Sequence, residues 1–159
     1  MRAARLLSAV AVAMLLSVNA IAGALEDCAA AYDRRDYGAA VQLCRPLAEK
    51  GDARAQLSLG GIYYNGQAVQ QDYAEAAKWT RKAAEQGYAP AQADLGVLYW
   101  NGQGVPQDIV LAYMWFSLAA AHEPDAVEER DLAASQMTSD EIAEAQRLAR
   151  EWKPTTPSP

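Results

Sequence analysis

The segment Ala91–Asp108, "AQADLGVLYWNGQGVPQD", decides the fold, because Ala55–Asp72 reads almost the same, "AQLSLGGIYYNGQAVQQD". Extending the alignment in both directions pairs residues 52–87 with residues 88–123 without a gap. Sixteen positions of this 36-residue repeat are identical in the two copies. Repeats of a fixed period in this range build solenoids or arrays, in which each unit packs against its neighbours.

Each copy of the repeat predicts two helices. In the first copy, the leading helix is expected to begin after Asp52, a residue that commonly caps helix N-termini. It should end at Asn65-Gly66, because glycine readily adopts the left-handed conformation that stops a helix. A six-residue loop follows. Asp72 is then expected to start the second helix, with Glu75 completing a capping box.

Gly60 and Gly96 fall inside the two leading helices, at equivalent positions of the repeat. A glycine inside a helix costs about 1 kcal/mol relative to alanine. Its recurrence at one position predicts that the paired helices come into close contact there. The sequence therefore predicts an all-α protein built from antiparallel helix hairpins.

The repeated residues also resemble a known family. The shared pattern is A-x-A-Q-x-x-L-G-x-x-Y-x-N-G-x-x-V-x-x-D-x-x-x-A-x-x-W-x-x-x-A-A. This pattern is similar to the Sel-one-like repeat (SLR), a relative of the tetratricopeptide repeat. The resemblance implies a short α/α superhelical solenoid that works by binding other proteins.

The repeat period and the capping signals divide the whole chain into six segments. The spacing of Asp36, Ala40 and Gly51 continues the repeat upstream, which indicates a degenerate first hairpin. Downstream, Pro124 is expected to open a helix, and Thr138 with Glu141 forms a capping box that starts another. The predicted segments are a signal peptide (1–24), the degenerate hairpin (25–51), two full repeats (52–87 and 88–123), C-terminal capping helices (124–152) and a disordered tail (153–159).

The N-terminal segment has the pattern of a secretory signal. Arg2 and Arg5 form a basic start, and Leu6–Val18 form an apolar stretch. Ala22-Gly23-Ala24 supplies the small residues of a cleavage site, with Val18-Asn19-Ala20 as a second choice. A membrane anchor is the alternative, although about 20 apolar residues are needed to cross a bilayer. The expected location is exported, either periplasmic or secreted, with no membrane anchor after cleavage.

The charge balance excludes two classes of partner. After cleavage the chain keeps 12 of its 14 basic residues and all 20 acidic residues, a net charge of −8. Nucleic-acid phosphates require a basic patch, and anionic lipids attract basic segments. We therefore expect no nucleic acid partner and no binding to anionic membranes, which leaves a protein or peptide as the expected partner.

The chain has two cysteines, Cys28 and Cys44, and both follow the predicted cleavage site. An even number of cysteines in an oxidising compartment favours a disulfide. Two buried free thiols are the alternative reading of the residues alone. The family resemblance supports the bridge, since cysteine-rich SLR proteins tie paired helices together in this way.

Catalytic motifs are missing from the sequence. No serine has a lysine three residues further on, and there is no Gly-x-Ser-x-Gly, Cys-x-x-Cys or pair of histidines. The lone His122 is read as a charge near a helix end rather than a base or a metal ligand. We assign no catalytic, cofactor-binding or metal-binding residue. Two other function classes stay open: a cell-wall-associated or β-lactam-interacting enzyme, and a glycan-binding module that stacks sugars on Tyr64 and Trp100.

The resemblance also predicts where a partner binds. In tetratricopeptide-type solenoids the leading helices of successive units line the concave face. Tyr64 of the first copy and Trp100 of the second occupy the same repeat position, and both are aromatic although the motif does not require it. Trp100 is the expected anchor. The alternative is that both rings pack beneath the neighbouring unit or the C-terminal cap. The predicted partner-binding residues are Arg54, Leu57, Tyr64, Asn65, Ala93, Val97, Trp100 and Asn101.

Overall fold

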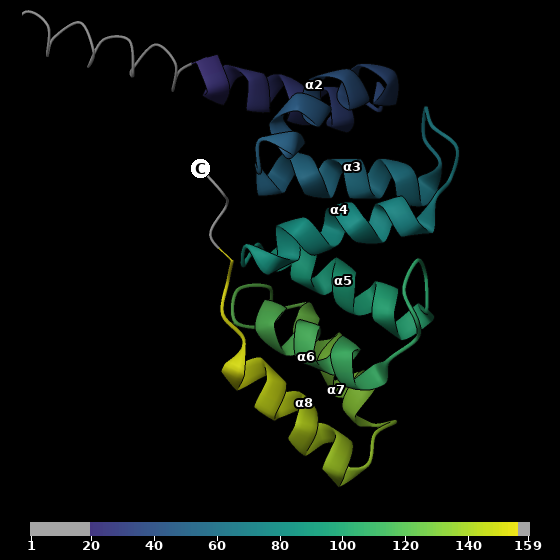
Figure 1. The fold of residues 1–159 in the computed structure, drawn as a ribbon, viewed down its shortest axis with the longest axis vertical. Coiled ribbons are helices and arrows are strands. Elements are labelled where there is room, and N and C mark those ends of the chain that lie inside the picture. Colours follow the sequence, from purple (N-terminus) through teal and green to yellow (C-terminus); the bar gives the residue numbers. More distant parts are fainter. Residues whose placement is uncertain (1–19, 156–159) are drawn as a thin grey trace, which may run out of the picture.

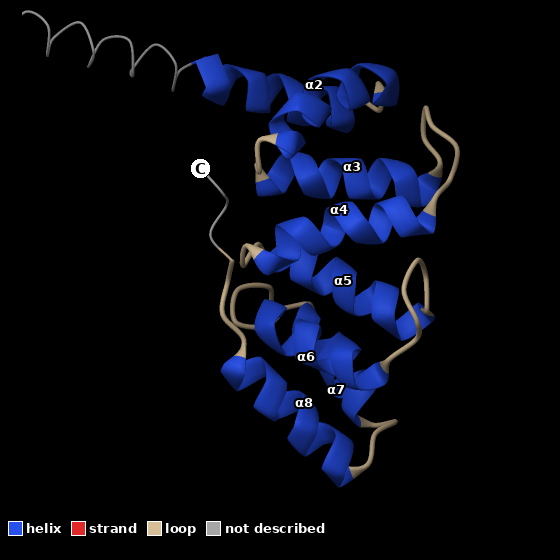
Figure 2. Ribbon diagram, viewed as in Figure 1, coloured by secondary structure: helices blue, strands red, loops and turns tan. Residues whose placement is uncertain are grey.

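The structure is a computed structural model that describes residues 20–155, and this part of the chain forms only helices and loops (Figures 1 and 2). Figure 1 shows the helices stacked in chain order along the long axis of the molecule. The predicted all-α solenoid of helix hairpins is therefore confirmed. The helices are the N-terminal helix (residues 20–33), α2 (Tyr37–Glu49), α3 (Ala53–Asn65), α4 (Tyr73–Glu85), α5 (Ala89–Asn101), α6 (Ile109–Ala119), α7 (Ala126–Ala134) and α8 (Ser139–Glu151).

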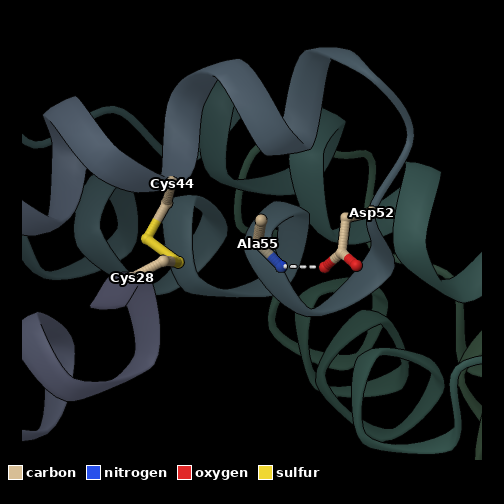
Figure 3. Close-up of a disulfide and its surroundings, with 4 residues drawn as sticks. All are labelled: Cys28, Cys44, Asp52 and Ala55. Atoms are coloured by element: carbon tan, nitrogen blue, oxygen red, sulfur yellow. Dashed lines mark hydrogen bonds between the residues drawn. A yellow bond between two sulfur atoms is a disulfide. The ribbon is translucent and has the colours of Figure 1, made fainter. Parts of the chain in front are cut away.

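The repeated residues fix the ends of the leading helices. The side chain of Asp52 accepts a hydrogen bond of 2.9 Å from the backbone nitrogen of Ala55 and caps α3 (Figure 3). Gly66 and Gly102 end α3 and α5 in the left-handed conformation, each with a φ of 65°. Most other residues disfavour this conformation, so the predicted stop at Asn-Gly is confirmed in both copies.

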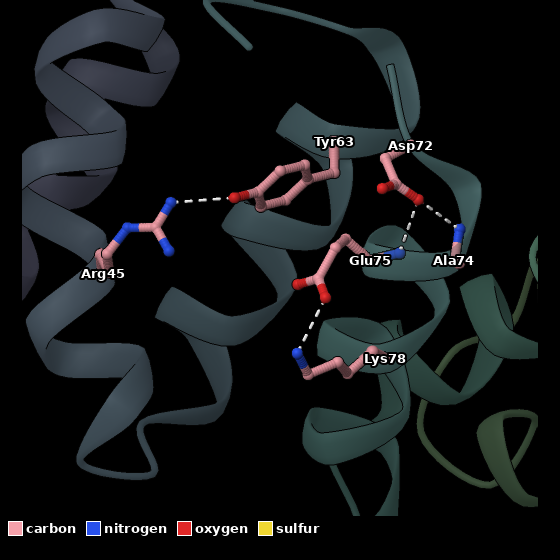
Figure 4. Close-up of polar contacts among 6 residues, drawn as sticks. All are labelled: Arg45, Tyr63, Asp72, Ala74, Glu75 and Lys78. Atoms are coloured by element: carbon pink, nitrogen blue, oxygen red, sulfur yellow. Dashed lines mark hydrogen bonds and ion pairs between the residues drawn. The ribbon is translucent and has the colours of Figure 1, made fainter. Parts of the chain in front are cut away.

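The predicted capping box at the start of α4 was wrong. The side chain of Asp72 accepts hydrogen bonds from the backbone nitrogens of Ala74 and Glu75, at 2.9 and 3.0 Å (Figure 4). The backbone nitrogen of Asp72, however, already donates to the carbonyl of Tyr63 at 3.0 Å. The carboxylate of Glu75 therefore has no free donor to reach, and it pairs with Lys78 at 2.8 Å instead.

The two helical glycines mark the close approach of paired helices, as predicted. A methyl group added at Gly60 would place its carbon 2.5 Å from the hydroxyl oxygen of Thr80. At Gly96 the same carbon would lie 2.6 Å from two ring carbons of Phe116. Thr80 and Phe116 are both buried and occupy equivalent positions of the two repeats. In each of the two full repeats, the paired helices are thus in close contact where a glycine faces a buried side chain.

We expect Gly96→Ala to lower the free energy of unfolding by about 1–3 kcal/mol, because the buried ring of Phe116 has no room to move aside. Gly60→Ala is the matched control and should cost less, since Thr80 can change rotamer and alanine favours the helix. Urea unfolding of the two variants measures the difference. A loss at Gly60 as large as the loss at Gly96 would contradict the explanation.

Two buried glutamines tie each repeat to the hairpin before it. The amide nitrogen of Gln56 donates to the carbonyl of Ala48 at 3.0 Å, in the last turn of α2. Gln92 makes the equivalent bond to Ala84 at 3.3 Å, in the last turn of α4. Each of these carbonyls also accepts a bond from a backbone nitrogen, of Gly51 and Gly87 respectively, so the glutamine adds a second donor that links two hairpins.

The structure forms the disulfide between Cys28 and Cys44, as the sequence predicted (Figure 3). It joins the N-terminal helix to α2, with 5.0 Å between the two Cα atoms and both side chains buried. Arg45 of α2 donates a hydrogen bond of 2.9 Å to the hydroxyl of Tyr63 on α3 (Figure 4). The first hairpin is therefore closed by a covalent bond and attached to the first full repeat.

The C-terminal pair of helices covers the second repeat. The capping box of Thr138 and Glu141 at the start of α8 is confirmed. The helix before it, α7, begins at Ala126 rather than at Pro124, since Pro124 and Asp125 form a tight turn. The predicted helix of about a dozen residues is accordingly shortened to nine.

The two ends of the chain are described only in part. Residues 153–155, predicted to be loose, lie along the end of α4, where the backbone nitrogen of Thr155 donates to the carbonyl of Glu85 at 2.7 Å. Residues 156–159 and most of the predicted signal peptide lie outside the described residues, although residues 20–24 belong to the N-terminal helix. Within residues 20–155, no helix combines the length and the apolar character needed to cross a membrane.

Candidate partner-binding groove

Two cavities open along the leading helices of the four hairpins, and we call them together the groove. Their volumes are about 290 Å³ for the first and about 190 Å³ for the second, and Val97 of α5 borders both. The first cavity is lined by Tyr32, Gly60, Gly61, Tyr64, Asn65, Ala76, Thr80, Asp94, Val97 and Leu98. The second is lined by Val97, Trp100, Asn101, Phe116, Glu129 and Leu132.

One wall of the first cavity comes from Tyr32 on the N-terminal helix. A methyl group at Gly61 would place its carbon 2.7 Å from the hydroxyl oxygen of Tyr32, so the missing side chain makes room for the tyrosine. The ring of Tyr32 meets the ring of Tyr37 edge-on, with 5.6 Å between centroids. The second repeat has Val97 where the first has Gly61, and therefore only the first repeat can accept a tyrosine in this way.

Tyr64, at the end of α3, also lines the first cavity. Its hydroxyl donates a hydrogen bond of 2.9 Å to the side-chain carbonyl of Gln103, in the loop after α5. Its ring meets the ring of Tyr73 edge-on, with 5.2 Å between centroids. Tyr64 therefore lines the cavity, while its ring contacts Tyr73 of its own repeat and its hydroxyl reaches the next repeat.

Asp94 of α5 is the acidic residue of the first cavity. The side chain remains exposed at the cavity mouth, yet the surrounding protein excludes much of its water. Burial, followed by the negative charge of Glu129, raises the pKa of Asp94 to about 6. Within residues 20–155, no cluster of three His, Cys, Asp or Glu side chains could hold a metal ion.

The second cavity is mainly apolar. Trp100 packs its ring on the buried ring of Phe116, with 6.1 Å between centroids and a tilt of 56°. Leu132 of α7 forms the other side and leaves 57% of its surface exposed. Glu129, one helical turn before Leu132, places a carboxylate at the rim of the cavity. An exposed leucine beside a tryptophan makes this end of the groove an apolar patch.

The structure brings together most of the predicted partner-binding residues. Arg54 is an exception, since it lies at the start of α3 and borders a separate cavity against the N-terminal helix. Leu57 and Ala93 are half-buried and line neither cavity of the groove. The five predicted residues that line the groove are Tyr64, Asn65, Val97, Trp100 and Asn101.

Several residues that line the groove were missed by sequence reasoning, and four of them carry a charge or a large side chain that faces a cavity: Tyr32, Asp94, Glu129 and Leu132. Asp94 could have been predicted from the sequence, because it precedes Val97 by three residues and Asn101 by seven. This spacing places all three residues on one helix face. The other three lie on the flanking hairpins, where the repeat motif does not extend.

Comparison with known proteins identifies a family whose repeats match this chain. The Sel1 repeat family matches residues 53–88 and 89–123, the two copies recognised in the sequence. No curated protein matches the chain significantly.

The solved structures that are similar to this chain include two repeat proteins. One is the crystal structure of c5321, described as a protective antigen present in uropathogenic Escherichia coli strains displaying an SLR fold, with 34% identity and a TM-score of 0.76. The other is a Sel1 repeat protein from Oxalobacter formigenes, with 29% identity and a TM-score of 0.63. The matches cover 81% and 79% of this chain, but only 29% and 54% of those chains.

Proposed function

Because the chain belongs to the Sel1 repeat family, we propose that it binds a protein or peptide partner in the groove and acts as an interaction scaffold without catalysis of its own. Proteins built from these repeats generally mediate protein–protein interaction. The observation that carries the proposal is the apolar end of the groove, where Leu132 is 57% exposed beside Trp100. Large exposed apolar side chains next to an aromatic ring are typical of binding sites.

The proposal places the protein in an exported compartment, periplasmic or secreted. The disulfide between Cys28 and Cys44 supports this location, because disulfides persist in oxidising compartments. The basic start, apolar stretch and small residues before Leu25 support it independently.

The dimensions of the groove suit an extended segment of the partner. Asp94 and Trp100 stand six residues apart on α5, which corresponds to about 9 Å along the helix. An extended chain advances about 3.3 Å per residue, so about three residues bridge this distance. The two cavities would then receive two side chains of one short peptide segment.

We expect Leu132→Asp to weaken partner binding at least about thirtyfold, because it puts a charge on the apolar end of the groove. The melting temperature should change little, since the side chain is mostly exposed. Affinity capture from the exported fraction, followed by titration of the captured protein, measures the effect.

Leu43→Asp is the matched control, because Leu43 is also exposed, at 38%, and lies on α2 outside the groove. It should capture the same partner as the unchanged protein. Equal capture by both variants would contradict the proposed site, and turnover of a substrate such as nitrocefin by the pure chain would contradict the scaffold.

Trp100→Ala is a less selective test of the groove than Leu132→Asp. Because the ring packs on Phe116 at 6.1 Å, its removal should lower stability as well as binding.

A further inference from the structure

The first cavity combines two aromatic walls with one carboxylate. Tyr32 and Tyr64 face it from the N-terminal helix and α3, and Asp94 faces it from α5. The hydroxyl of Tyr64 is engaged by Gln103, which holds this ring in place. The carboxylate of Asp94, in contrast, makes no hydrogen bond or ion pair with any residue of the described range 20–155. A carboxylate at the mouth of a cavity whose lining residues supply no positive charge is available to a cationic ligand.

We propose that this cavity binds the cationic side chain of a lysine or arginine in the partner segment, with Asp94 as its counter-charge and the two tyrosine rings as its walls. This inference rests on the proposed function and adds the chemistry of the partner. Aromatic faces attract cations, and a carboxylate accepts charge-assisted hydrogen bonds from ammonium and guanidinium groups.

The charges around the groove favour the same ligand. Glu129 borders the second cavity, and none of the residues that line either cavity is a lysine or an arginine. An acidic partner segment would meet only repulsion there. A divalent cation alone is a poor alternative, because such ions need several oxygen ligands and the cavity offers one carboxylate.

The second cavity then sets the rest of the recognised pattern. Its apolar wall of Trp100 and Leu132 suits an aliphatic or aromatic side chain. With about 9 Å between Asp94 and Trp100, an extended segment would place this side chain two to three residues from the cation. The expected partner pattern is a basic residue followed or preceded at that spacing by a large apolar residue.

The cavity also predicts how binding responds to pH. The groups that face Asp94 from neighbouring elements are Glu129 of α7 and Tyr32 of the N-terminal helix, and neither supplies a positive charge. A bound cation favours the ionised carboxylate, so binding is strongest above the pKa of about 6 in the free protein. Lowering the pH from 7 to 5 protonates Asp94 and should weaken binding about tenfold.

A positional array of N-acetylated heptapeptides tests the inference, with leucine fixed at the centre and every other position varied through the natural residues. Acetylation removes the terminal amine, so any cation must come from a side chain. The unchanged protein should prefer lysine or arginine over serine by about tenfold at a position two or three residues from the leucine. Asp94→Asn should abolish that preference and its pH dependence, while melting no lower than the unchanged protein.

The outcomes separate this inference from the proposed function. If leucine peptides bind without preferring a basic residue, or if Asp94→Asn keeps the preference, the cation site is wrong and the groove function stands. If no peptide binds and Leu132→Asp changes no partner capture, both are wrong. Selection of acidic residues would overturn the cation site directly.

Discussion

Replacing Gly104 with alanine should lower the free energy of unfolding by about 3 kcal/mol or more, the largest effect of any single methyl group that we expect in this protein. Gly104 lies in the loop between α5 and α6 with a φ of 71°. An added methyl group would overlap the backbone carbonyl of Tyr73 and lie 2.9 Å from the backbone nitrogen of Ala74. Backbone atoms at the start of α4 cannot move aside without shifting the whole helix.

The equivalent residue of the first repeat, Ala68, supplies a control in which the expected change in the free energy of unfolding has the opposite sign. Ala68 adopts the same left-handed conformation, with a φ of 59°, and is exposed. Its conformation is strained for alanine, so Ala68→Gly should be neutral or stabilising by up to about 1 kcal/mol. A gain of stability from Ala68→Gly as large as the loss from Gly104→Ala would show that the loop conformation, not the contact with α4, decides the result.

Gly104→Asn separates the two causes further. Asparagine tolerates positive φ better than alanine, yet it carries the same Cβ atom. If the overlap with Tyr73 is the cause, the asparagine variant should be as unstable as the alanine variant. Thermal unfolding measures all three variants, and a loss of about 3 kcal/mol should lower the melting temperature by roughly 10 °C.

The contact at Gly104 is also a condition for the groove. The same loop carries Gln103, which accepts the hydrogen bond from Tyr64. Displacing the loop would release Tyr64 from one wall of the first cavity. We therefore expect Gly104→Ala to weaken peptide binding even below its melting temperature.

The sequence predicted the parts of the fold that depend on local chemistry. The stop at Gly66 and the cap at Asp52 follow from backbone rules that act within a few residues. The close contact at Gly60 and Gly96 was predictable because the repeat showed the same costly residue twice. The failed capping box at Glu75 shows the limit of such rules, since a carbonyl from the preceding helix had already taken the donor.

The site was less predictable because it is formed between hairpins. Tyr32 reaches the groove only because Gly61, on another helix, leaves room for it. Leu132 and Glu129 face the groove from the capping helix α7, whose residues follow no repeat. No spacing rule along one helix contains these contacts, and they depend on the rotation of each hairpin against the next.

Removing the disulfide, by Cys28→Ala together with Cys44→Ala, should cost about 3 kcal/mol, the value for closing a loop of similar length. The two cysteines are 16 residues apart in the chain. Signal cleavage after Ala24 would leave residues 25–33 of the N-terminal helix, and an isolated helix of this length is not stable in water. The covalent bond to α2 therefore adds a restraint to the apolar contacts that Ala31 and Tyr32 make from this helix.

The loss should be centred on the first hairpin and extend to α3, because the buried residues of α3 pack with that hairpin, whereas α4 to α6 share a separate buried cluster. Hydrogen exchange should accelerate most in residues 25–49 and stay slow in residues 73–119. Equal protection of the first hairpin with and without the bridge would contradict this account.

The redox state of the two cysteines should also affect peptide binding, because the bridged N-terminal helix carries Tyr32, which lines the first cavity. Without the bridge, Tyr32 should leave the first cavity, so the preference for a basic residue should fall while the preference for leucine in the second cavity remains. Tyr32→Ala in the bridged protein is the matched control and should reproduce the binding change with little loss of stability, since Tyr32 is only half-buried. If the variant without cysteines keeps its preference for basic residues, the tyrosine wall is not needed, and Asp94 alone accounts for the selectivity.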